Sequence, residues 1–97
     1  MIRYTKHFLD SLESIIAETE YILRYEKGNF KSGYCVLKDT RLILVNKFFS
    51  LEGKINSLVE IIRQLNISPE GLSEKSQKRL KEILQAAPIG TEQPPLN

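Results

Sequence analysis

The chain has 97 residues with 14 basic and 12 acidic side chains, so its formal net charge at pH 7 is only +2. Hydrophobic residues make up 41% of the chain and charged residues 27%, a balance that excludes disordered and fibrous proteins. The length predicts a single domain over residues 1–87, and so weak a charge does not by itself imply a nucleic-acid partner.

Neither a membrane span nor a signal peptide is predicted. No segment has the roughly 20 consecutive apolar residues of a spanning helix. Asp10, Glu13 and Glu18 interrupt the apolar residues near the start. The single cysteine, Cys35, cannot form an internal disulfide. We therefore expect a cytoplasmic protein without membrane association.

Residues 5–26 are predicted to form one long amphipathic helix, because apolar side chains recur there at spacings of three and four. The stripe follows a heptad, with further apolar residues beside it: Leu9, Leu12, Ile16, Thr19 and Leu23, then Phe8, Ile15 and Ile22. The repeat is too short for a coiled coil, so we expect this helix to pack on a core. Gly28-Asn29 is the expected end of the helix.

Residues 33–49 are predicted to form a β-hairpin. Continuous apolar runs at 34–37 and 42–45 flank the polar segment 38–41, which suits a four-residue turn. Successive strand side chains point to opposite faces, so both faces of this hairpin are apolar and need cover. Gly33, at its start, marks either a β-bulge or a close approach of two backbone segments.

Two further helices are predicted, at 51–65 and 74–86, with a short turn at 69–72 between them. Ser50 is the expected N-cap of the first, because its hydroxyl can accept a free backbone N–H of the first turn. Asn66 is the expected C-cap of the same helix.

The predicted fold is therefore α+β, in the order helix, strand, strand, helix, helix (α-β-β-α-α), with a disordered tail at 88–97. A two-stranded sheet is marginal alone and has two free edges. A homodimer that joins the hairpins edge to edge or face to face would cover them. The alternative is a monomer whose hairpin lies between its own helices.

No catalytic or metal-binding set emerges from the sequence. His7 is the only histidine, and the glycines at 28 and 33 precede a strand and not the helix of a phosphate-binding loop. Cys35 is either a small buried hydrophobic residue or, with Arg41 or Lys47 beside it, a nucleophile. We therefore predict no enzyme, no cofactor and no metal.

The segment Val59-Glu60-Ile61-Ile62-Arg63 resembles the HExxH stretch of zinc metallopeptidases, in which two histidines bind zinc and the glutamate activates water. Glu60 matches that glutamate, but Val59 and Arg63 stand at the histidine positions. The resemblance therefore implies a helix with neither zinc nor peptidase activity. The alternative is an ordinary amphipathic helix with a solvated Glu60.

A second resemblance covers more of the chain. The pattern SGYC at 32–35, ILVNK at 43–47 and LEGKI at 51–55 is similar to a family of small, uncharacterised bacterial proteins of about this length. The resemblance implies a bacterial cytosolic domain and brings no activity with it. It marks four positions of interest: Gly33, Cys35, Asn46 and Lys47.

We predict a non-enzymatic structural or protein-interaction module that acts as a homodimer, with an interface formed by the hairpin and the first helix. The candidate interface or functional residues are Tyr34, Cys35, Leu44, Asn46, Lys47 and Glu60. No motif names a further protein partner.

The second hypothesis is a small nucleic-acid-binding protein. Basic and aromatic residues interleave around the hairpin and can hold phosphates and stack bases: Arg24, Lys27, Lys31, Lys38, Arg41 and Lys47, with Tyr25, Phe30 and Tyr34. Glu20 and Glu26 dilute this patch, so a solvated face is the alternative. A thiol enzyme based on Cys35 is the third hypothesis.

Overall fold

The computed structural model describes residues 2–27 and 34–85. In chain order its elements are α1 (Lys6–Ala17), β1 (Ile22–Glu26), β2 (Tyr34–Leu37), β3 (Leu42–Asn46), α2 (Leu51–Leu65), the 3-10 turn η1 (Pro69–Gly71) and α3 (Glu74–Gln85). The predicted α+β class is confirmed. The predictions for the tail at 88–97, for Gly33 and for Gly28-Asn29 lie outside the described residues.

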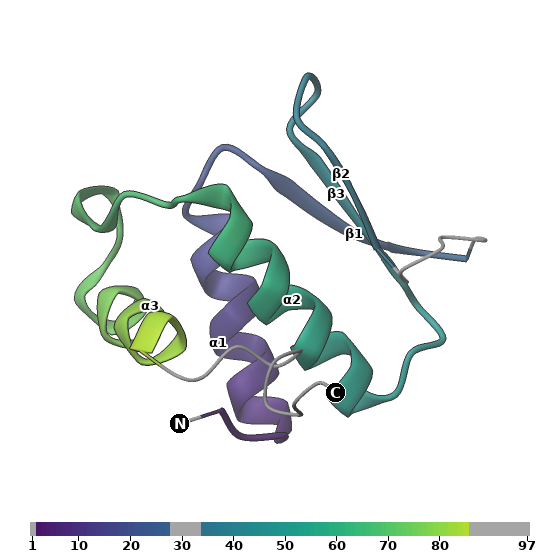
Figure 1. Ribbon diagram of the computed structural model, residues 1–97, viewed down its shortest axis with the longest axis horizontal. Helices are drawn as coiled ribbons and strands as arrows, with labels where there is room; N and C mark the ends of the chain where they lie inside the picture. Colours follow the sequence, from purple (N-terminus) through teal and green to yellow (C-terminus); the bar gives the residue numbers. More distant parts are fainter. Residues whose placement is uncertain (1, 28–33, 86–97) are drawn as a thin grey trace, which may run out of the picture.

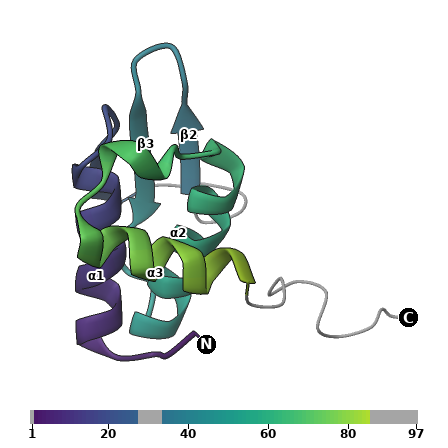
Figure 2. The same cartoon turned by 90° about the vertical axis from the view of Figure 1, so that its left-hand side faces the viewer.

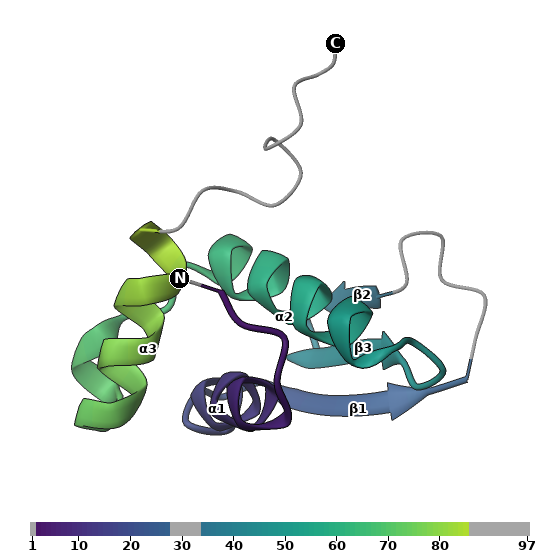
Figure 3. The same ribbon diagram turned by 90° about the horizontal axis from the view of Figure 1, so that it is seen from below.

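β3 is the central strand of the sheet. It runs parallel to β1 on one side and antiparallel to β2 on the other, as Figure 3 shows. α1 and α2 lie against one face of the sheet (Figure 1). α3 packs on these two helices from the side away from the sheet (Figure 2).

The prediction of one helix over residues 5–26 is wrong in its second half. α1 ends at Ala17, and β1 occupies the last five residues of the predicted helix. The hydroxyl of Thr19 stabilises the turn between them, because it donates to the carbonyl of Ile16 at 2.6 Å and accepts the N–H of Tyr21 at 3.1 Å. The element order is therefore helix, three strands, two helices, and β1 pairs with the β3 edge that a lone hairpin would leave open.

The other predicted elements are confirmed. β2 and β3 cover the two apolar runs, and the turn at 38–41 ends with Arg41 at a φ of 55°. The hydroxyl of Ser50 accepts the N–H of Gly53 at 3.1 Å and caps α2. Asn66 ends α2 in the left-handed conformation, with a φ of 51°.

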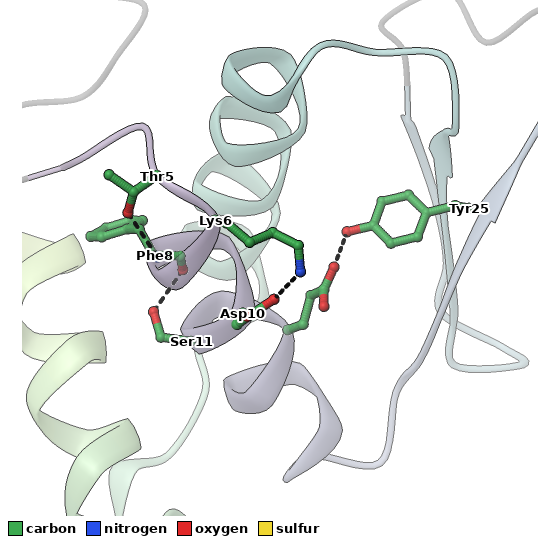
Figure 4. A network of polar contacts seen from close by, with 7 residues as sticks. Thr5, Lys6, Phe8, Asp10, Ser11 and Tyr25 are labelled. Carbon is green, nitrogen blue, oxygen red and sulfur yellow. Dashed lines mark hydrogen bonds and ion pairs between the residues drawn. The ribbon is translucent and has the colours of Figure 1, made fainter.

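The core lies between the sheet and the helices. Its almost fully buried side chains come mainly from α1, β3 and α2: Phe8, Leu9, Leu12, Ile15, Ile16, Ile43, Val45, Ile55, Leu58, Val59, Ile61, Ile62, Leu72, Leu80 and Ile83. Tyr25 extends from β1 to α1, where its hydroxyl donates to Glu13 at 2.5 Å (Figure 4). Among the described residues, no helix is both long and apolar enough to cross a membrane.

Candidate protein-interaction surface

The face of the sheet that points away from the helices is built by alternate residues of the three strands. Strand side chains alternate between two faces, and residues paired across a sheet share a face. Ile43 and Val45 are fully buried in the core, so their neighbours along β3 point the other way. We call this surface the outer sheet face; its residues are Ile22, Arg24, Glu26, Cys35, Leu37, Leu42, Leu44 and Asn46.

One row of the outer sheet face is entirely apolar. Ile22 of β1, Leu42 of β3 and Leu37 of β2 lie side by side next to the 38–41 turn. Ile22 is 61% exposed and Leu37 is 41% exposed. Figure 1 shows the sheet edge-on with α1 and α2 on one side only, so no helix of the described chain covers this row. Contiguous large apolar side chains on a surface indicate an interaction site.

The charges of the outer sheet face are confined to β1. In the second row, Leu44 lies between Arg24 and Cys35. In the third row, Glu26 lies beside Asn46. The guanidinium of Arg24 is 2.9 Å from the carboxylate of Glu26, so the two charges balance each other. The centre of the face, along β3, is therefore apolar for two of its three rows.

Three of the predicted site residues, Cys35, Leu44 and Asn46, lie together on the outer sheet face. The thiol of Cys35 is free and partly buried. The two cations expected beside that thiol have other partners. Arg41 forms an ion pair with Glu20, and the ammonium of Lys47 lies 5.4 Å from the centre of the Phe48 ring. This arrangement does not favour an activated thiol.

Two other predicted residues, Tyr34 and Glu60, meet on the opposite side of the sheet. The hydroxyl of Tyr34 donates to the carboxylate of Glu60 at 3.2 Å and accepts from the side-chain amide of Gln64 at 3.2 Å. Burial, and in addition the Glu60 carboxylate, raise the pKa of Tyr34. These bonds tie β2 to α2, and Glu60 therefore has a structural partner.

The basic patch predicted for nucleic acid is partly neutralised. Arg24 pairs with Glu26 and Arg41 with Glu20, the two glutamates that the sequence places among the basic residues. The predicted members at 30–31 lie outside the described residues. Paired arginines offer less charge to a phosphate backbone, so the described geometry favours a solvated rim.

A polar groove of about 420 Å³ lies between α1 and α3 and is lined by His7. Two of its charged side chains join α3 to α1. The guanidinium of Arg79, which pairs with Glu82 within α3, lies 4.4 Å from the centre of the Phe8 ring of α1. Glu18 accepts hydrogen bonds from the first turn of α3. These contacts give the groove a role in helix packing.

The sequence prediction missed the part of the outer sheet face that β1 contributes. A helix over residues 5–26 assigns Ile22 to a helical stripe and leaves Glu26 without a structural place. The signal that could have identified β1 is an alternation of period two. Leu23 and Tyr25 pack on the core, while Ile22, on the other face, is exposed. The heptad spacing outweighed this short alternation.

Comparison with known proteins found no match with a family model, a curated protein or a solved structure. Within the described residues, no group of three His, Cys, Asp or Glu side chains is arranged to hold a metal ion.

Proposed function

We propose that the protein is a non-enzymatic protein-interaction module that forms a homodimer through the outer sheet face. The observation that carries the proposal is the apolar row in which partly buried Leu42 lies between exposed Ile22 and exposed Leu37. Burying these side chains against a second copy would remove them from water, which is the main driving force of association. The proposal places the module in the bacterial cytoplasm, where the thiol of Cys35 stays reduced.

A second copy is a suitable partner because the outer sheet face is electrically balanced. Its two charged residues, Arg24 and Glu26, already pair with each other. A two-fold dimer brings the same patch together from both protomers, so a patch with one dominant charge would repel itself. This face has no such charge.

The positions of the potentially reactive side chains support a non-enzymatic role. Cys35 lies on the outer sheet face, and Glu60 lies on α2, bonded to Tyr34 of β2. His7 belongs to the first turn of α1. Nucleophilic and acid–base catalysis need such groups within hydrogen-bond reach of one another, and here they belong to separate parts of the fold.

The test is the molar mass in solution, measured by light scattering over a hundredfold range of protein concentration. We expect the mass to rise from 11.2 kDa towards twice that value. Leu44→Glu should keep the mass at the monomer value, because it places a charge at the centre of the apolar face. Gln85→Glu, at the exposed end of α3, adds the same charge away from the sheet and should behave as wild type. A monomeric wild type at every concentration would refute the homodimer.

The nucleic-acid alternative is tested in the same preparations with a fluorescent single-stranded oligonucleotide. Phosphate contacts make binding strongly salt-dependent, so tight binding at low salt that is lost at higher salt would support it. Arg24→Ala removes one basic group of the predicted patch. If the protein is an interaction module, wild type and Arg24→Ala should bind the oligonucleotide equally weakly.

A further inference from the structure

We propose that the two copies stack face to face with β3 of one protomer against β3 of its partner, and with the two-fold axis running along this strand. This inference rests on the proposed homodimer and specifies how its surfaces meet. The dimer would then have two three-stranded sheets at its centre and the helices of each protomer on its outer sides.

The distribution of side chains favours an axis along β3. Rotation about this strand places β1 of one protomer over β2 of its partner, so each row of the outer sheet face meets the same row of the second copy. Ile22 then faces Leu37 of the second copy, and Leu42 faces its own counterpart. Apolar groups are thus buried against apolar groups.

An axis across the strands gives a poorer match. It reverses the order of the rows, so that the apolar row meets the row of Glu26 and Asn46 when the faces overlap fully. The carboxylate of Glu26 would then lie against Ile22 of the second copy and lose its hydration without a compensating partner. With the axis along β3, Arg24 and Glu26 stay at the edge of the contact, where water reaches them and their mutual ion pair persists.

Edge-to-edge pairing would leave the apolar row of the outer sheet face exposed to water. β2 offers four residues and β1 five for such pairing. Either edge joined to a second copy would extend the sheet, but Ile22 and Leu42 would remain in contact with water in both protomers. Face-to-face stacking covers them, and it matches the aligned packing of two twisted sheets.

The size of the face sets the strength of the association. Three strands about 4.8 Å apart and five residues at about 3.3 Å each give a face of about 14 by 17 Å. Such a contact belongs to the small, weak class of interfaces and not to the standard class of about 800 Å² per partner. The dimer should therefore dissociate on dilution.

The axis can be tested by charge complementation at Leu42, which meets its own copy only when the axis runs along β3. Leu42→Glu and Leu42→Lys should then each be monomeric because of like-charge repulsion. An equimolar mixture of the two variants should regain the dimer mass, because glutamate then meets lysine. Circular dichroism of each variant shows that it is folded, and recovery on mixing itself requires folded partners.

Ile22 supplies the matched control, because it lies away from the axis and faces Leu37 of the second copy. A mixture of Ile22→Glu and Ile22→Lys should remain monomeric, since the two new charges do not meet. Dimers that persist in Leu42→Glu and Leu42→Lys, or a Leu42 mixture that stays monomeric, would overturn stacking along β3 while a dimeric wild type keeps the proposed function. A wild type that is monomeric throughout overturns both.

Discussion

The carboxylate of Glu18, directly after α1, accepts the backbone N–H of Ser73, directly before α3, at 2.8 Å. It also accepts the hydroxyls of Ser73 and Ser76 at 3.1 and 2.9 Å. In a capping box, an acid three residues after the N-cap accepts the N-cap N–H. Ser76 occupies that position here, and Glu18 supplies the carboxylate from another helix.

Glu18→Ala should destabilise the protein by about 1 kcal/mol, the usual effect of losing a helix cap. The measurement is urea unfolding followed by circular dichroism. Ser73→Ala removes a partner of the same carboxylate, so the loss in the double variant should be smaller than the sum of the two single losses. Additive losses would show that Glu18 and Ser73 do not act together.

The stability contributed by Glu18 should depend on pH. The Ser73 N–H and, in addition, the hydroxyls of Ser76 and Ser73 hold the pKa of Glu18 below its ordinary value. A carboxyl with a lowered pKa in the folded state contributes stability above its unfolded pKa of about 4.3 and loses it as pH falls through the folded value. The difference in unfolding free energy between wild type and Glu18→Gln should therefore become smaller as the pH of the measurement is lowered from about 5 to about 3. A constant difference over this range would contradict the carboxylate's role.

Tyr25→Phe should lower the free energy of unfolding by about 1–3 kcal/mol, the usual loss when a hydrogen bond to a charged group is deprived of its donor. The Tyr25 hydroxyl donates to Glu13 at 2.5 Å (Figure 4). Burial and this carboxylate raise the pKa of Tyr25, so the phenol is protonated and donates at neutral pH. Tyr21→Phe is the matched control, because within the described residues no partner of the Tyr21 hydroxyl is found. Equal losses in the two variants would exclude the bond to Glu13 as the cause.

Local signals account for the elements that the sequence predicted correctly. The hairpin has two apolar runs around a polar turn, and α2 has a cap at each end, Ser50 and Asn66. β1 carries a weaker local signal, because Leu23 fits both the heptad of a helix and the alternation of a strand. Pairing with β3, some 20 residues further along the chain, decides between them. Single-sequence patterns do not contain that pairing.

The same difference decides which site residues could be predicted. Cys35 and Leu44, two of the candidate residues, lie side by side because the hairpin register follows from its own turn. Ile22 and Arg24 join them only after β1 has paired with β3. The position of Glu60 beside Tyr34 depends on the packing of α2 against the sheet, which no local pattern specifies.

Asn66→Ala should destabilise the protein by about 1 kcal/mol, because an L side chain other than asparagine or aspartate is strained in the left-handed region. Asn66 has a φ of 51° and ψ of 52° at the end of α2. Asn66→Gly should cost much less, since glycine adopts this conformation freely. Thermal unfolding of the three proteins gives the comparison, and equal losses for alanine and glycine would exclude backbone strain as the reason.

Cys35 gives a readout of the dimer that does not depend on mass. Its thiol is free and lies on the outer sheet face next to Leu44, so a second copy stacked on this face should slow its labelling by a thiol reagent. The labelling rate should fall as the wild-type concentration rises through the dissociation constant, whereas Leu44→Glu should show the same rate at all concentrations. Mass spectrometry of quenched samples measures both. If the molar mass doubles while the labelling rate stays constant, the copies meet through a surface other than the outer sheet face.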